Sequence, residues 1–173
     1  MSLTMYQASV PVFAQVLGAL TKVLDKGEAH AAAKKIDPAV LLGCRLAPDM
    51  FPLSRQVQTV CDFAKGASAR LAGVEVPGWA DNEKTFAELK ERAKKTSEYV
   101  LSFKPAQIDG SEAREVTIKI GGNPVTFKGQ PYLLQFVIPN LFFHATAAYA
   151  ILRHNGVEVG KRDFLGQVPG LTA

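Results

Sequence analysis

An asparagine and a histidine stand four residues apart in the most apolar stretch of the chain, at Asn140 and His144. In a helix, residues at this spacing lie one above the other on the same face. That face otherwise carries Leu133, Val137, Ala147 and Ile151. One interpretation is a small polar site in a helical core, where such pairs can provide two ligands to one metal. The other is a satisfied core histidine, with an asparagine that repairs the helix near Pro139.

A second amphipathic segment, residues 49–72, supplies candidate partners for this pair. Gln56 lies beside its apolar stripe, and we expect its amide to lie across from His144. Asp49 is better placed as a helix cap than as a ligand, and Cys61 fits a small core residue. The predicted binding pocket is therefore Gln56, Asn140 and His144, with no metal assigned to it.

Other chemical signatures are missing from the sequence. There is no phosphate-binding GxxxxGK[ST] loop, no dinucleotide fingerprint and no G-x-S-x-G nucleophile elbow. His30 is expected in a solvated connection, and His154 near a helix C-terminus, where a cation is favoured. These two histidines do not complete a metal site.

Four segments with apolar residues every three or four positions predict the helices that position the pocket. The first contains Pro11 and is expected to stop at Lys26-Gly27, and the charged face of the third is expected to be solvated. Asp81 is the expected cap of the third helix, and the tail after Gly156 is expected to be irregular. The predicted helices cover residues 3–25, 49–72, 82–103 and 131–154.

Alternating residues around a Gly121-Gly122-Asn123-Pro124 turn predict one small β-hairpin within 115–128. Two short strands do not form a sheet domain alone, so they must pack on the helices. The expected architecture is all-α: an antiparallel four-helix bundle with one hairpin before the last helix. Residues 1–173 are expected to form a single domain.

Composition excludes several classes of protein. The chain has 173 residues, of which 47% are hydrophobic and 21% charged, so it is not disordered or a disulfide scaffold. No secretory signal or run of about 18 apolar residues is present. These absences predict a cytoplasmic protein without a membrane partner, and the two cysteines fit a reduced pair there. A net charge of +4, balanced locally by glutamate, makes nucleic acid an unlikely partner.

The stretch from His144 to Gly156 resembles the last helix of the DinB-like (YfiT-like) superfamily of four-helix bundles, which includes many proposed metalloenzymes. In that superfamily the helix carries two histidines four residues apart, followed by a Leu-Arg pair, and a third histidine lies on the second helix. Counted back from Leu152-Arg153, His144 matches the second histidine and Asn140 the first. Residues 49–72 contain no histidine, and Gln56 or Gln58 stands in that region. The resemblance therefore implies the fold but an incomplete metal site.

Over nearly its full length the chain resembles an uncharacterised bacterial subfamily of that superfamily, a domain of unknown function. The segments that carry this resemblance are Met5–Phe13, Leu46–Met50, Pro52-Leu53, Gln56–Gln58, Cys61–Lys65, Asn155–Val157 and Gly160–Phe164.

Two functions follow as expectations. The first is a bundle without metal chemistry that binds a small molecule around Gln56, Asn140 and His144, or acts as a homodimeric structural module. The alternative is a metal-dependent enzyme of the thiol transferase or hydrolase type that uses His144 as a ligand or general base. Neither names a cofactor. Superfamily members often pair, and extra apolar residues beside the first helix's stripe also favour a homodimer: Met5, Val12, Val16 and Val23.

Overall fold

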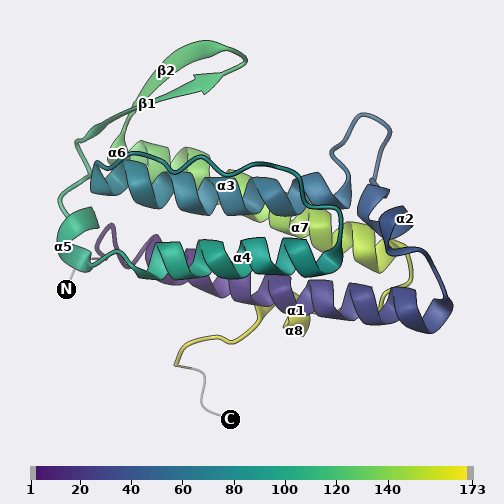
Figure 1. The fold of residues 1–173 in the computed structure, drawn as a ribbon. Helices are drawn as coiled ribbons and strands as arrows, with labels where there is room; N and C mark the ends of the chain where they lie inside the picture. Colours follow the sequence, from purple (N-terminus) through teal and green to yellow (C-terminus); the bar gives the residue numbers. More distant parts are fainter. Residues whose placement is uncertain (1–2, 171–173) are drawn as a thin grey trace.

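The computed structural model describes residues 3–170, so the ends of the predicted domain 1–173 lie outside the described residues. Four long helices lie side by side: α1 (Val10–Lys34), α3 (Leu53–Ala72), α4 (Phe86–Leu101) and α7 (Ile138–His154) (Figure 1). The shorter elements are α2 (Pro38–Gly43), α5 (Pro105–Ile108), α6 (Gly129–Pro131), the π-helix η1 (Tyr132–Val137), α8 (Lys161–Leu165) and the strands β1 (Glu115–Ile120) and β2 (Asn123–Lys128). The predicted all-α bundle with one hairpin before the last helix is confirmed.

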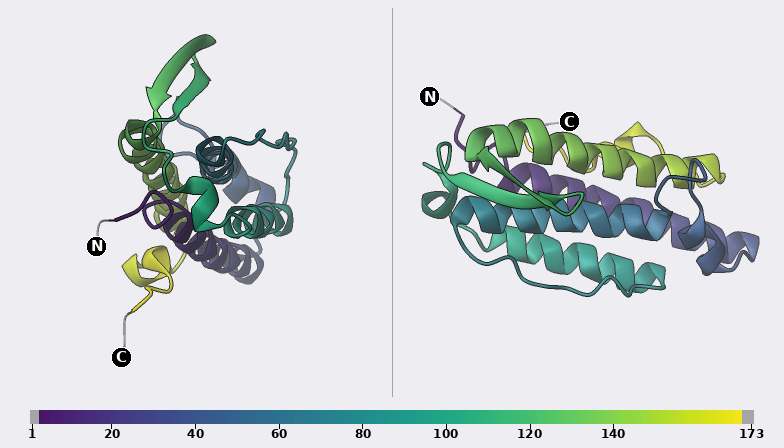
Figure 2. Two further views of the ribbon diagram at one scale, coloured as in Figure 1. Left: turned by 90° about the vertical axis from the view of Figure 1, so that its left-hand side faces the viewer. Right: turned by 90° about the horizontal axis from the view of Figure 1, so that it is seen from above.

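Two antiparallel pairs form the bundle: α1 packs on α4, and α3 packs on α7 (Figures 1 and 2). In contrast, α3 and α4 run in the same direction, because residues 73–85 return along the length of α3 before α4 begins. Thirteen extended residues reach about 40 Å, which is enough to pass a helix of about 30 Å. This connection is longer and more important to the fold than the sequence suggested.

The first helix is displaced from its predicted range of 3–25. It begins at Val10, because Pro11 lacks an N–H and fits the first turn, and it continues to Lys34. Gly27 is therefore a packing residue, not a stop: a Cβ there would lie 3.0 Å from Leu152 and 3.1 Å from Phe86. This glycine lets α1 approach both α7 and α4 closely. His30 consequently lies half-buried in α1, not in a solvated connection.

The second and third helices begin later than predicted. The helix α3 begins at Leu53 after Pro52, so Asp49 is not its cap. The helix α4 begins at Phe86, because Thr85 and Glu88 form a reciprocal capping box. Asp81, the expected cap, is engaged in ion pairs instead.

The hairpin projects from one end of the bundle, as Figure 2 shows, and its strands pair in the register Glu115↔Lys128 to Ile120↔Asn123. Val116 and Phe127 form an inward-facing pair that packs against the bundle. At the base of the hairpin, a Cβ on Gly129 would lie 2.0 Å from the carbonyl oxygen of Ser111. Only glycine permits this close backbone approach, so it fixes where the hairpin joins the last helix.

The last helical stretch runs without a break through α6, η1 and α7. Within it, the N–H of Ile138 bonds to the carbonyl of Leu133, five residues back. Pro139 explains this local widening, because it provides no N–H to continue the α-helical ladder. By length and composition alone, Gly129–His154 could cross a membrane, with a mean hydropathy of 1.3. Here it packs along α3, and core helices of soluble proteins meet the same criterion.

The C-terminal segment, expected to be irregular, forms α8 and packs on α1. Phe164 of α8 lies with Val16 and Val23 around one small cavity, and both valines are buried. Met5 is buried too. The extra apolar residues of the first helix are therefore covered mainly within the chain, so they do not support the predicted homodimer.

Candidate functional site

His144 and Gln56 face each other across the seam between α7 and α3, as expected. Nδ1 of His144 lies 2.7 Å from Oε1 of Gln56. The other end of the Gln56 amide is fixed as well, because its Nε2 donates to the carbonyl of Phe51 over 3.1 Å. Since Oε1 therefore faces the imidazole, Nδ1 carries the proton and Nε2 of His144 keeps its lone pair.

Aromatic rings enclose the imidazole of His144 on several sides. The ring stacks on Phe51 and Phe63, with centroid distances of 6.1 and 5.9 Å, and meets the edge of Phe143 at 5.2 Å. Sequence reasoning identified none of these phenylalanines. The available signal was on α3, where Gln56, Phe63 and Arg70 recur every seven residues and so share one face.

The surroundings of His144 favour its neutral form. Partial burial disfavours the imidazolium, and the positive charge of Arg55 acts in the same direction, so the pKa of His144 lies below its ordinary value of 6.5. At neutral pH the side chain is an uncharged imidazole that donates through Nδ1 and accepts through Nε2.

The predicted burial of both polar residues in the core stripe is wrong. His144 and Asn140 are half-buried, and the fully buried positions at their level are Leu141 and Ala145. Asn140 forms no hydrogen bond with Gln56; its Nδ2 donates to the carbonyl of Phe136 over 2.7 Å. This bond agrees with the alternative that the asparagine hydrogen-bonds to the backbone near Pro139, although its acceptor is Phe136 and not the carbonyl of Gln135 that the proline leaves without an α-helical donor.

A three-imidazole metal centre does not fit these residues. The positions that the superfamily resemblance assigns to ligands hold one imidazole, and amides take the place of the other two. The Gln56 amide is hydrogen-bonded at both ends, and the amide nitrogen of Asn140 is committed to the backbone. Among residues 3–170 no group of three His, Cys, Asp or Glu side chains could hold a metal ion.

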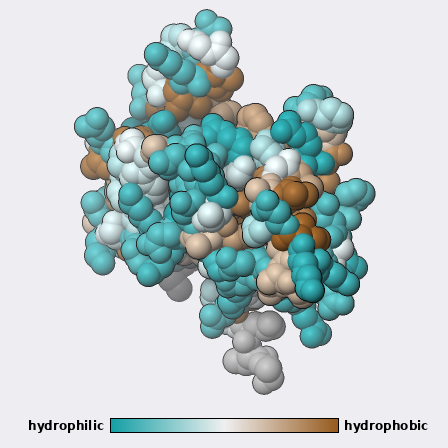
Figure 3. Space-filling model, turned by 45° about the vertical axis from the view of Figure 1, so that its right-hand side comes forward, coloured by the Kyte–Doolittle hydropathy of each residue, from teal (hydrophilic) through white to brown (hydrophobic). Residues whose placement is uncertain are grey.

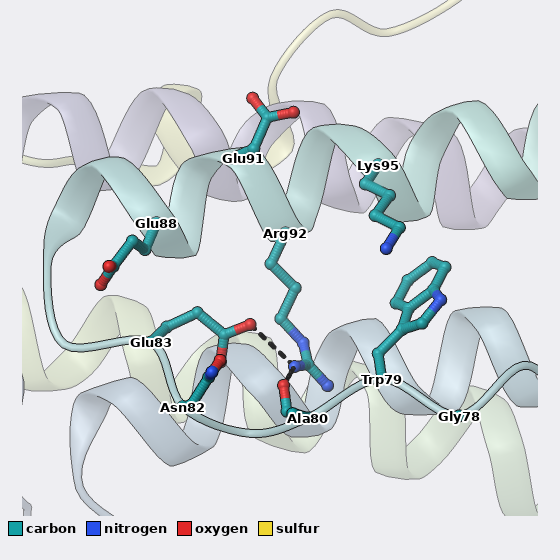
Figure 4. Close-up of a pocket in the computed structure, with 9 residues that line it drawn as sticks. All are labelled: Gly78, Trp79, Ala80, Asn82, Glu83, Glu88, Glu91, Arg92 and Lys95. Carbon is teal, nitrogen blue, oxygen red and sulfur yellow. Dashed lines mark hydrogen bonds and ion pairs between the residues drawn. The ribbon is translucent and has the colours of Figure 1, made fainter.

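The connection 73–85 is fastened to the bundle by Arg92, whose guanidinium is buried. Its Nη1 donates to the carbonyl of Ala80 and to Glu83, both at 2.9 Å, and its Nη2 pairs with Asp62 at 2.9 Å and Asp81 at 2.7 Å. Figure 4 shows Arg92 reaching from α4 to this connection, beside a groove of about 470 Å³. The prediction of a fully solvated charged face on this helix is wrong at Arg92, because three carboxylates of other segments compensate its charge.

The ion pairs of Arg92 extend to the surroundings of His144 through Asp81. Asp81 pairs with Arg55 as well as with Arg92. Arg55 in turn lies 5.8 Å from the centre of the Phe51 ring and contributes to the low pKa of His144. In the same connection, the ring of Trp79 lies between two lysines. Nζ of Lys65 is 4.6 Å from the ring centre and Nζ of Lys95 is 4.4 Å from it.

An exposed aromatic surface lies next to the histidine. Phe51 and Phe143 are 47% and 57% exposed and their rings pack against the imidazole, and with His144 we call them the aromatic face. Large apolar side chains are normally scattered singly on a protein surface. Two exposed phenylalanines against one half-buried imidazole form a patch of the kind that marks an interaction site.

Comparison with known proteins agrees with this architecture. Residues 5–165 match the family model described as a domain of unknown function, DUF1993. The chain belongs to the DUF1993 family. Its fold matches the crystal structure of a DinB family member protein from Shewanella denitrificans, with a TM-score of 0.86 and 42% sequence identity. The match covers 97% of this chain and 95% of that chain.

A search of curated proteins finds no match for this DUF1993 chain. The resemblance to a DinB-like subfamily of unknown function is confirmed by the family model and by the Shewanella structure.

Proposed function

We propose that this DinB-like protein is a metal-independent module that acts as a cytoplasmic homodimer, with the aromatic face as the contact between the two copies. The observation that carries the proposal is the cluster of exposed Phe51 and Phe143 around an uncharged His144. Aromatic side chains are enriched at the centres of protein interfaces, whereas charged groups are depleted there.

The state of His144 suits such a contact. A neutral imidazole costs far less to desolvate than a charged one, and Gln56 already satisfies its Nδ1. The cytoplasmic assignment rests on the two free thiols, Cys44 and Cys61.

The size of the chain is compatible with this arrangement. A stable interface buries about 800 Å² per partner, which is less than a tenth of the 9585 Å² that this chain exposes. A second copy is favoured over an unrelated partner because two-fold homodimers are the commonest closed assemblies.

Light scattering on matched variants tests the proposal. Phe143→Glu places a charge in the aromatic face and should convert the dimer to a monomer. Val40→Glu is the control, because Val40 is 58% exposed on α2, outside the aromatic face, and this variant should remain dimeric. Equal masses for the two variants, whether both dimeric or both monomeric, would contradict the proposed interface.

A further inference from the structure

A further groove lies between the hairpin and the bundle, next to the aromatic face, because Phe63 lines the groove and also stacks on His144. It is a groove of about 650 Å³, which is within the usual range of about 300–1,000 Å³ for small-molecule sites. Phe63, Tyr132 and Phe136 line its bundle side, and Ile118, Ile120 and Pro124 line its hairpin side. Figure 3 shows hydrophobic residues gathered at the base of the hairpin, below its more hydrophilic tip.

One cation in this groove has no matching anion. Arg70 is half-buried and lines the groove, and its Nη1 bonds to the hydroxyl of Tyr132 over 3.2 Å. Within residues 3–170 no carboxylate lies within ion-pairing distance of this guanidinium. A guanidinium has five N–H donors in a fixed fork that matches a carboxylate, so most of its binding capacity is unused.

The position of Arg70 is set by the helix that carries it. A Cβ on Gly66, one turn earlier in α3, would lie 2.4 Å from Nη1 of Arg70. The absence of a side chain at position 66 therefore lets the guanidinium fold back along α3 toward Tyr132.

The other charges in the groove leave it positive. Asp62 is the carboxylate that lines it, and this group is already paired with Lys65 at 3.0 Å and Arg92 at 2.9 Å. Lys119 of β1 adds a second cation to the hairpin side. The groove thus combines aromatic walls with uncompensated positive charge.

We propose that this groove binds a small organic carboxylate with a flat apolar body. The carboxylate accepts hydrogen bonds from the guanidinium of Arg70, and the apolar body lies between Phe63 and Phe136 on one side and Ile118 on the other. An inorganic anion would leave the aromatic walls without a partner, and a neutral aromatic molecule would leave Arg70 unpaired. This site is additional to the proposed dimer contact and does not depend on it.

The test is calorimetric titration of the protein with 2-naphthoate and with its neutral analogue 2-naphthamide. Charge-assisted hydrogen bonds contribute about 1.5–3 kcal/mol, so we expect naphthoate to bind at least about ten-fold more tightly than the amide. Arg70→Gln should lose at least that factor for naphthoate. Arg153→Gln, which removes an exposed arginine outside the groove, should bind as the wild type does.

Gly66→Ala provides a second test, in which the charge of Arg70 is kept. Because the new methyl group displaces the guanidinium from its position, this variant should also bind naphthoate more weakly. The fluorescence of Trp79, the single tryptophan, reports whether each variant is folded. Phe143→Glu should leave naphthoate affinity unchanged, which separates this site from the dimer contact.

Three binding results would each overturn the proposal: no naphthoate binding by the folded wild type, equal affinity for acid and amide, or full affinity in Arg70→Gln. Dissociation of a dimer by naphthoate would also overturn it, because the groove would then hold a residue of the second copy.

Discussion

Nδ1 of His144 donates a hydrogen bond to Oε1 of Gln56 over 2.7 Å, and the carbonyl of Phe51 holds the other end of that amide. Gln56, which is only 1% exposed, thereby sets the tautomer of His144 at the seam between the antiparallel helices α3 and α7. This relationship sets the tautomer of the histidine in the aromatic face, whereas partial burial and the charge of Arg55 favour its neutral form.

Gln56→Glu should raise the pKa of His144 above its wild-type value. A carboxylate in place of the amide stabilises the imidazolium, whereas the present surroundings lower the pKa through partial burial and the charge of Arg55. The imidazole signals in a pH titration by NMR measure both values. The wild-type spectrum should also show the proton on Nδ1; a proton on Nε2 would contradict the orientation of the Gln56 amide.

His144→Ala should lower the free energy of unfolding by about 1–3 kcal/mol, because Oε1 of buried Gln56 loses its donor. Urea denaturation measures the change. His154→Ala is the matched control, since His154 is exposed near the end of α7, and it should shift stability by no more than about 0.5 kcal/mol. Equal effects of the two substitutions would show that the hydrogen bond to Gln56 is not stabilising.

Arg92→Met should destabilise the protein much more than Lys94→Met, which changes an exposed lysine on the same helix. Removing one partner of a buried ion pair costs about 3–5 kcal/mol. We expect the lower end of that range, because Asp62 and Asp81 are 36% and 34% exposed and can regain water. A loss similar to that of Lys94→Met would mean that Arg92 does not fasten the connection 73–85.

The same cluster should make the fold sensitive to acid. Burial alone would raise the pKa values of Asp81 and Glu83, but hydrogen bonds and charge outweigh burial and lower both pKa values below the ordinary 3.8 and 4.5. The contributing arginines are Arg55 and Arg92 for Asp81, and Arg92 for Glu83. A depressed carboxyl pKa stabilises the fold above the unfolded-state value, and this stability is lost as pH falls through the folded-state value. Urea unfolding at a series of pH values should show a steeper loss below pH 4.5 in the wild type than in Arg92→Met.

The two cysteines should differ in reactivity. Burial raises the pKa of the Cys61 thiol to about 11, despite a hydrogen bond with Thr96 and the charge of Arg92, so almost no thiolate forms near neutral pH. Cys44 is only half-buried. Brief treatment with iodoacetamide should therefore modify Cys44 alone, as mass spectrometry would show, and both should react in guanidinium chloride. Modification of native Cys61 would indicate that the core opens easily.

Much of this fold follows from periodicity in the sequence. The four helical segments and the hairpin are where alternation and three-four spacing predict them, because burial of an apolar face decides both. The pairing of Gln56 with His144 was predicted from the same periodicity, because each residue lies at or beside the apolar stripe of its helix. Helix ends were less predictable: Gly27 resembles a stop but serves close packing, and Thr85 with Glu88, not the expected Asp81, caps the third helix.

The parts that sequence reasoning missed depend on contacts between distant segments. Arg92 looks like any surface arginine of an amphipathic helix until the connection 73–85 brings Asp81 and Glu83 to it. The aromatic face arises likewise, since Phe51 precedes α3 and Phe143 lies on α7. Chain topology creates both the ion pairs of Arg92 and the aromatic face, so the local residue pattern does not predict them.

The central claim, a homodimer that needs no metal, is tested most directly by sedimentation equilibrium of the tag-free wild type, with and without a chelator. We predict a mass of twice 18.7 kDa at tens of micromolar, unchanged by the chelator. A mass of 18.7 kDa at that concentration, or a dimer that dissociates when metal is removed, would contradict the account.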